Sequence, residues 1–376
     1  DKLNIAETSE EQETGYLNVA LFGLDSREGD LGKGNRSDTM MIASLNKATG
    51  EVKLVSVYRD TLLELDDGSY NKANAAYAFG GPEGAISMIN RSMDMDISKY
   101  VAVNFNALVD VIDALGGLDI TLTDAEVVHM NNYCVETSKV TGADYTKIEP
   151  EVAGTYHLNG VQAVSYSRIR YTGGGDFERT SRQRHVLELI AEKAQSASFS
   201  TLNKIIDKVF PQVSTNFTIT EMIAYAKDIA KYKLGDSMGF PDNNSFDMLD
   251  VVGSVVIPET LTSNVEDVHK FLFGDDGYTI SSNVTDIEAG IREKCTHKAT
   301  SDSVIESDDD YGSGSGTSND YSNSGSSNSN YNNSYNNSGS SSGTGSGSGT
   351  GDSGGGSDYG DYGGGSDGDY SGEDYD

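Results

Sequence analysis

The chain has 376 residues, a formal net charge of −32 and 36% hydrophobic residues. This length is enough for one large domain or two ordinary ones with a sizeable core. Part of the negative charge belongs to the C-terminal segment, because no lysine or arginine follows Lys298. The rest of the chain is still acidic, which argues against nucleic acid as a partner.

The first part of the chain predicts three strands. Apolar runs over 17–24 and 40–45 are typical of buried strands, and the alternation over 52–58 is typical of a half-buried one. Charged residues stand at the ends of these runs: Asp25, Arg27, Arg36, Asp38, Arg59 and Asp60. If the strands are neighbours, these side chains meet at one edge of a sheet, where α/β proteins carry their sites.

Predicted helices and strands alternate in the next part, which indicates an α/β fold. The elements are a short helix over 71–79 ended by Gly80 and Gly81, a helix over 82–93, a strand over 100–105, a helix over 108–115 and a strand over 118–122. Residues 124–157 have weak periodicity and are expected to form a long irregular excursion, either a lid or a surface insertion.

A second charged segment follows a short predicted helix over 158–164. It combines a predicted strand around 168–170 with a long amphipathic helix over 179–197. Eight of the ten arginines fall in the two charged segments: Arg27, Arg36, Arg59, Arg168, Arg170, Arg179, Arg182 and Arg184. Because the guanidinium fork matches phosphate oxygens bidentately, this concentration predicts a site for a polyanion.

The folded part is expected to end near residue 300. Its last predicted elements are helices over 200–210 and 219–233, a strand over 251–257 and a helix over 265–273. From about Ser301 the composition changes to Ser, Gly, Asn, Asp and Tyr, which predicts a disordered tail over 301–376.

Residues 1–15 are polar and have the composition of a juxtamembrane linker, and no run of 18 apolar residues occurs in the chain. The two cysteines, Cys134 and Cys295, are far apart in the sequence. They could equally form a disulfide or remain buried thiols. The five histidines are scattered without ligand spacing, so a zinc site is not expected.

A series of motifs resembles the LytR-CpsA-Psr family of cell-wall glycopolymer ligases. The resemblance covers about residues 16–197 and consists of Asp25-Ser-Arg27, Arg36-Ser-Asp-Thr39, Ser56-Val-Tyr-Arg-Asp-Thr61, Lys72-Ala-Asn-Ala-Ala-Tyr77, Gly80-Gly81, Ala114-Leu-Gly-Gly117, Arg168-Ile-Arg170, Asp176-Phe-Glu-Arg179 and Arg182-Gln183. Each motif is weak alone, and the ordered series is strong. Tyr58 stands where the family often has Pro, which changes a neighbour of Arg59 without removing a charge.

The resemblance implies a three-layer α/β/α fold around a central mixed β-sheet, as a catalytic domain over 16–300. It implies an extracytoplasmic protein of a Gram-positive bacterium, held at the outer face of the membrane and the cell wall by an N-terminal anchor absent from this chain. The implied reaction is Mg²⁺-dependent transfer of an anionic glycopolymer, such as teichoic acid or capsule, from a polyprenyl pyrophosphate carrier onto peptidoglycan.

The resemblance also assigns site residues. Asp25 and Asp38 match the Mg²⁺-binding carboxylates. The pyrophosphate-binding set comprises Arg36, Arg59, Arg168, Arg170, Arg179 and Gln183. We expect Arg36 and Arg59 to act in catalysis, with Asp176 as the candidate general base for the acceptor hydroxyl.

Other interpretations of these residues are open. Asp25 and Asp38 could be cap and turn residues beside strand ends, and Arg168 with Arg170 could be a surface charge pair. We expect Asp60 to orient an arginine rather than to act as a base, and Arg184 to lie on a solvated helix face. Ten apolar residues could line a groove for the polyprenyl chain or simply fill the core: Tyr77, Phe79, Ile86, Ile89, Leu108, Val111, Ile112, Val186, Leu189 and Ile190.

Two other functions use the same site. One is a pyrophosphatase that hydrolyses the lipid pyrophosphate with water as acceptor. The other is a regulator that binds the lipid-linked polymer without catalysis.

Overall fold

The computed structural model describes residues 3–5, 13–26, 31–172, 175–274 and 277–295. The predicted tail over 301–376, Arg27 and most of the predicted linker lie outside the described residues. No helix within the described ranges has both the length and the apolar composition needed to cross a bilayer.

A mixed sheet of six strands, in the order β10-β3-β2-β1-β6-β9, organises the fold. The strands are β1 (Tyr16–Leu24), β2 (Ser37–Asn46), β3 (Glu51–Val57), β6 (Lys99–Val103), β9 (Ser214–Thr215) and β10 (Lys233–Phe240). β2 is antiparallel to β1 and β3, whereas β6 is parallel to β1 and β10 is parallel to β3. The prediction that the first three strands are neighbours is confirmed.

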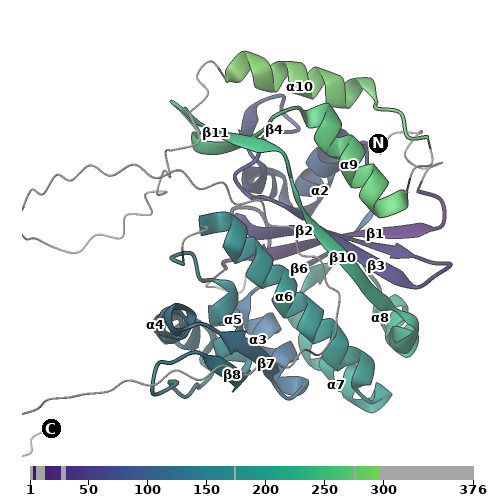
Figure 1. Cartoon of the computed structure of the whole chain (residues 1–376). Helices are drawn as coiled ribbons and strands as arrows, with labels where there is room; N and C mark the ends of the chain where they lie inside the picture. Colours follow the sequence, from purple (N-terminus) through teal and green to yellow (C-terminus); the bar gives the residue numbers. More distant parts are fainter. Residues whose placement is uncertain (1–2, 6–12, 27–30, 173–174, 275–276, 296–376) are drawn as a thin grey trace, which may run out of the picture. The chain divides into compact units, whose positions relative to one another are not determined.

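Helices lie on both sides of this sheet, which gives the predicted three layers (Figure 1). On one side are α2 (Ala73–Met93), α9 (Leu261–Phe273) and α10 (Ser282–Lys294). Their buried side chains pack with alternate residues of the strands, such as Phe22 and Ile42, in one large core. The break predicted at Gly80 and Gly81 is confirmed, because α2 is kinked at Gly81, whose φ of 68° and ψ of −161° are not helical.

The other side carries α3 (Phe105–Ala114), α4 (Asp124–Thr141), α5 (Gly160–Ser167), α6 (Gly175–Ser196), α7 (Phe199–Val209) and α8 (Ile219–Lys227) (Figure 1). α3 to α6 enclose a second core together with the antiparallel pair of β7 (Leu118–Leu122) and β8 (Gly154–Leu158). Two further pairs, β4 (Leu62–Glu64) with β5 (Tyr70–Lys72) and β11 (Asn244–Leu249) with β12 (Gly253–Pro258), complete the strands.

The prediction of an irregular excursion over 124–157 is wrong, because most of it is α4 and β8. A capping box in which Thr123 and Glu126 bond each other's backbone begins α4. Its buried face is marked by Val127, Met130 and Cys134, at helical spacing. Polar residues interleave with that face, which hides the periodicity in the sequence.

The two cysteines belong to different cores. Cys134 is buried in the core around α4, whereas Cys295 packs at the edge of the core around α9 and α10. Both thiols are free, and burial raises the pKa of each to about 11. Of the two alternatives, the structure therefore supports unpaired thiols.

Candidate functional site

A β-bulge at the edge of the sheet positions Asp38. Gly23 pairs with Thr39 and Leu24 pairs with Ser37, so Asp38 is the extra residue of β2. Gly23 permits this close approach, since a Cβ atom there would lie 2.9 Å from the Cβ of Thr39. Bulges re-aim a side chain out of the strand alternation and occur beside active sites.

Arg59 follows the end of β3 and contacts three carboxylates. Its Nη1 lies 2.8 Å from Oδ1 of Asp38, and its Nε lies 3.4 Å from both Oδ2 of Asp60 and Oδ1 of Asp176. Burial opposes the charge on Arg59, but the three aspartates outweigh it and raise its pKa above the ordinary value. The prediction that Asp60 pairs with an arginine is confirmed, and Lys72 Nζ lies 3.0 Å from its other oxygen.

Arg170 and Arg179 join the same group. Nη2 of Arg179 lies 2.5 Å from Oδ1 of Asp176 and donates to the Asp38 carbonyl oxygen at 3.3 Å. Nη2 of Arg170 approaches Oδ2 of Asp38 at 3.8 Å. We call Arg59, Arg170 and Arg179, with the aspartates that they contact, the arginine cluster.

Arg179 has spare donors in a buried position. Its side chain is 3% exposed, and its Nε and Nη1 have no hydrogen-bond partner among the described residues. Burial, opposed by Asp176 and reinforced by Arg59 and Arg170, lowers the pKa of Arg179 to about 10. An anion in contact with these donors would satisfy them and relieve the repulsion between the guanidinium groups.

Asp38 is the counter-charge of the cluster. Burial alone would raise the pKa of its carboxyl, but Arg59, Arg179 and Arg170 outweigh that effect and lower the pKa below its usual value. Asp38 is therefore ionised at neutral pH.

Asp25 and Arg36 lie at the same edge of the sheet. Asp25 comes directly after Leu24 and Arg36 directly before Ser37, and those two neighbours pair with each other. Both side chains are exposed. The prediction that strand-end charges meet at one edge therefore fits the register of β1 and β2.

Arg168 is placed differently from the prediction. It caps the C-terminus of α5 rather than lying on a strand, and its guanidinium binds Oε2 of Glu136 at 2.9 Å and Oγ1 of Thr137 at 3.0 Å. Within the described residues, Arg168 forms no ion pair with an aspartate of the arginine cluster. The guanidinium of Arg168 lies 5.4 Å from the ring centroid of Tyr133, whose hydroxyl also interacts electrostatically with Arg170 and Arg179.

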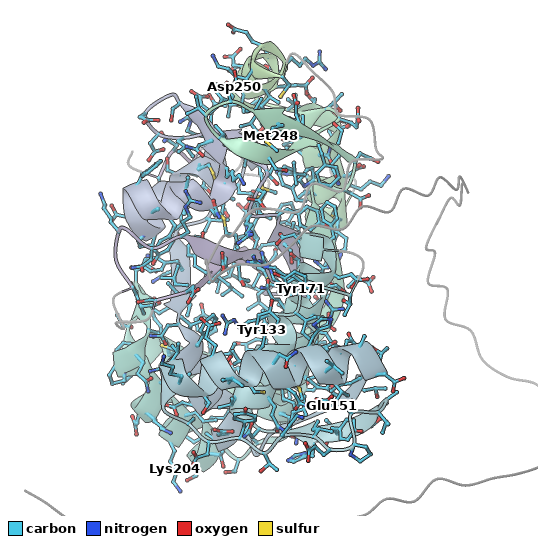
Figure 2. All side chains as sticks on the ribbon, turned by 90° about the vertical axis from the view of Figure 1, so that its left-hand side faces the viewer. Tyr133, Glu151, Tyr171, Lys204, Met248 and Asp250 are labelled. Carbon is cyan, nitrogen blue, oxygen red and sulfur yellow. The ribbon has the colours of Figure 1, made fainter. Side chains whose placement is uncertain are left out.

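Figure 2 shows Tyr133, from α4, and Tyr171, from the segment between α5 and α6, near each other in the middle of one face. Tyr171 is 72% exposed, and its ring centroid lies 6.0 Å from that of His129 on α4. Neither tyrosine was predicted as a site residue. Tyr171 directly follows Arg170, which is the signal that could have singled it out.

Arg182 holds in place the segment that carries Arg170, without an ion pair to the aspartates of the cluster among the residues that the structure describes. It binds Glu126 at 3.0 Å and Glu178 at 2.9 Å, and donates to the carbonyl oxygen of Ile169 at 3.1 Å. These bonds fix the segment that carries Arg170 against α4 and α6. Lys72 is a second supporting cation that sequence reasoning missed, although it begins one of the family motifs.

Gln183 and Arg184 of α6 are both half-buried. The prediction of a solvated face for Arg184 is wrong, because its Nη1 is buried and burial lowers its pKa. Gln183 is half-buried one turn after Arg179. Its predicted role in pyrophosphate binding stays a prediction.

The donor set for Mg²⁺ consists of two carboxylates. In the described part of the chain, no group of three or more His, Cys, Asp or Glu residues could hold a metal ion. Asp25 is exposed, and Oδ2 of Asp38 lies 3.8 Å from Nη2 of Arg170. Mg²⁺ is commonly held by one or two carboxylates together with substrate phosphates. The residues therefore fit an ion that binds with a phosphate, and not one held by the protein alone.

Half-buried apolar side chains cover the sheet face opposite the α2 side. Leu17, Val19 and Leu21 of β1 alternate with the buried residues of the first core, and Leu21 is paired with Val101 of β6. Val103 continues this set toward the edge that carries Asp25.

The predicted lipid groove is only partly supported. Five of its ten residues are fully buried core residues, and one is exposed; the buried ones are Tyr77, Ile86, Ile89, Ile112 and Val186, and the exposed one is Phe79. For the five buried residues the alternative of filling the core is confirmed, whereas the exposed Phe79 stays a groove candidate. The other four, Leu108, Val111, Leu189 and Ile190, are half-buried and remain candidates.

The sequence matches the model of the LytR_cpsA_psr family over residues 1–248. One curated relative is the polyisoprenyl-teichoic acid–peptidoglycan teichoic acid transferase TagU of Bacillus mycoides (strain KBAB4), 32% identical over 228 residues, or 60% of this chain and 68% of the relative.

Two solved structures have the same fold. The crystal structure of Bacillus subtilis TagV is 26% identical with a TM-score of 0.53, over 70% of this chain and 98% of that one. The structure described as TagT bound to LI-WTA is 22% identical with a TM-score of 0.55, over 70% of this chain and 92% of that one.

Proposed function

The chain belongs to the LytR_cpsA_psr family, and we propose that it transfers an anionic glycopolymer from a polyprenyl pyrophosphate carrier onto peptidoglycan. The observation that carries the proposal is the arginine cluster, in which the buried Arg179 keeps unpaired donors beside Arg59 and Arg170. The name of the TagU relative, a teichoic acid transferase from polyisoprenyl to peptidoglycan, supports the same reaction.

The reaction breaks one P–O bond and forms another. A hydroxyl of the acceptor attacks the phosphorus next to the glycopolymer, and polyprenyl phosphate leaves with the bridging oxygen. Arg59, Arg170 and Arg179 would neutralise the charge that builds on the non-bridging oxygens and on the leaving group, which is the main task in phosphoryl transfer.

Asp176 would accept the proton of the acceptor hydroxyl. Its carboxylate is 25% exposed and lies between Arg59 and Arg179. It is therefore fixed beside the groups that would hold the phosphate, which is the geometry required of a general base.

Mg²⁺ would bind at Asp25 and Asp38 together with the substrate phosphates. When bound, it would neutralise phosphate charge that the arginines leave uncompensated. The two aspartates hold their positions through the strand end and the bulge, so the protein's part is to orient the carboxylates.

The polyprenyl chain would lie against the half-buried apolar row of Leu17, Val19, Leu21, Val101 and Val103. This row runs along β1 toward Asp25, so a lipid on it would present its pyrophosphate to the cluster. Each methylene removed from water contributes about 0.8 kcal/mol, so a few isoprene units can supply much of the affinity. We propose that a protein with this role acts at the outer face of the membrane of a Gram-positive bacterium.

Product analysis tests the proposal against its two alternatives. The protein is incubated with a sugar-linked polyprenyl pyrophosphate and Mg²⁺, with and without peptidoglycan. Transfer predicts that sugar becomes covalently attached to peptidoglycan in equal amount to the polyprenyl phosphate released. Release without attachment would show a pyrophosphatase, and binding without release would show a non-catalytic regulator.

A further inference from the structure

A second group of polar side chains lies at the other end of β1, where the chain enters the sheet. Nδ2 of Asn18 donates to Oδ1 of Asp96 at 2.7 Å and also to Oε2 of Glu13. The Asp96 backbone N–H donates to the same Glu13 oxygen at 3.2 Å. This group therefore connects the segment before β1 with the segment between α2 and β6.

Two acceptor oxygens of this group are buried without a partner. Glu13 is 1% exposed and Asn18 is 3% exposed, and Oε1 of Glu13 and Oδ1 of Asn18 have no hydrogen-bond partner among the described residues. Leaving such buried atoms without a partner destabilises the fold.

The carboxyl groups of Glu13 and Asp96 also lack a cationic partner in the described part of the chain. Within the described ranges, neither Glu13 nor Asp96 forms an ion pair with a lysine, arginine or histidine. Burial, with Asp96 adding to it, raises the pKa of Glu13 to about 11. Two carboxyl groups in contact need either a shared proton or a cation between them.

We propose that Glu13, Asn18 and Asp96 form a binding site for a calcium-type divalent cation, separate from the catalytic edge. The two carboxyl groups and the Asn18 amide oxygen are hard oxygen ligands, and Ca²⁺ takes six to eight of these in flexible geometry. A half-turn of the Asn18 amide directs Oδ1 in place of Nδ2 toward both carboxylates. Asp96 is half-buried, so water completes the coordination from its side.

The cation supplies what the group lacks. It neutralises the pair of carboxylates and gives a partner to both unpaired oxygens. It also ties residue 13, which is remote in sequence from residue 96, to the core of the unit that carries the sheet. Bound calcium is therefore expected to stabilise the domain without entering the reaction.

Thermal unfolding in 2 mM CaCl₂ and in EDTA, at pH 7.5, tests this inference. We expect the melting temperature of the full chain to be about 4 °C higher in CaCl₂. This is the shift for a calcium concentration about ten times the Kd of the site. Glu13→Gln and Asp96→Asn should abolish the calcium shift, whereas Glu149→Gln, an exposed carboxylate, should retain it. Asp38→Asn should also retain it, which separates this site from the catalytic edge.

Titration calorimetry with CaCl₂ gives a second readout that does not depend on the variants folding well. The wild-type chain should bind calcium with a heat that persists in Asp38→Asn. Equal melting temperatures in CaCl₂ and in EDTA, with no heat of calcium binding for the wild type or for Asp38→Asn, would contradict the proposed site. A melting temperature that falls from pH 6 to pH 9 regardless of calcium would assign the pair to a shared proton instead.

Discussion

Nη1 of Arg59 lies 2.8 Å from Oδ1 of Asp38, although one residue follows β3 and the other lies near the start of β2. The two strands are antiparallel neighbours, so the end of β3 and the start of β2 lie at the same edge of the sheet. The bulge at Asp38 then turns its carboxylate toward the arginine. This ion pair joins the carboxylate that we propose as a Mg²⁺ ligand to the arginines that we propose bind phosphate.

Replacing Arg59 with Lys should reduce turnover more than it reduces folding. Lysine keeps one charge but cannot bridge Asp38, Asp60 and Asp176 with a planar fork. We expect kcat/KM for the lipid pyrophosphate to fall by about 10²- to 10³-fold, as for loss of one transition-state donor. Steady-state kinetics would measure this, with Lys53→Arg on the opposite sheet face as the control. A fall of less than threefold would remove Arg59 from the site.

Asp38→Asn should flatten the acid side of the stability profile. The pKa of Asp38 is lowered in the folded state, so its ionised form stabilises the protein above the unfolded pKa of about 3.9. That contribution is lost as the pH falls through the folded-state pKa. We expect the free energy of unfolding to decline less between about pH 4 and pH 2 in Asp38→Asn than in the wild type.

Urea denaturation at several pH values measures this difference. Glu83→Gln, which replaces an exposed carboxylate of α2, is the matched control and should follow the wild-type profile. Parallel acid profiles of Asp38→Asn and the wild type would contradict the pairing described here.

Asp25→Asn should impair the use of Mg²⁺ without affecting the fold. The residue is exposed just after β1, so its replacement should change the free energy of unfolding by less than about 0.5 kcal/mol. We expect the Mg²⁺ concentration for half-maximal turnover to rise at least about tenfold, since one of two carboxylate ligands is lost. An unchanged Mg²⁺ dependence would remove Asp25 from the metal site, with Asp67→Asn as the surface control.

Arg182→Met should destabilise the protein by about 3 kcal/mol. Its removal leaves Glu126 and Glu178 without their buried partner and frees the segment at Ile169. Arg184→Met, two residues further on, should cost less than half as much, because Arg184 is only half-buried. Urea denaturation would measure both, and equal effects of the two substitutions would contradict the supporting role of Arg182.

The sequence was sufficient to predict the layers of the fold and the edge at which the site lies. Strands with apolar runs ended by charged residues could be recognised locally, and the order of motifs around Asp25, Asp38 and Arg59 indicated one site. These features are encoded within short segments. Their pairing follows from the hairpin between β2 and β3, which a short connection determines.

Features that depend on distant contacts were not predictable in the same way. Arg168 and Arg170 are two residues apart, a spacing that on a strand would put them on one face. Arg168 instead binds Glu136 of α4, in a segment that the sequence predicted to be irregular. β10 and α10 were missed because their burial is set by β3 and α2, far away in the sequence. Likewise, the ten apolar groove candidates could not be divided between core and groove, because both uses produce the same helical spacing.

Equilibrium binding of geranyl pyrophosphate and geranyl monophosphate tests the central claim most directly, because only the diphosphate needs the whole arginine cluster. The wild-type chain should bind the pyrophosphate at least about tenfold more tightly than the monophosphate in the presence of Mg²⁺. Arg59→Lys and Arg179→Lys should each lose most of this preference. Equal affinity of the wild type for both ligands, or a preference that survives in both variants, would contradict the assignment of the cluster as the pyrophosphate site.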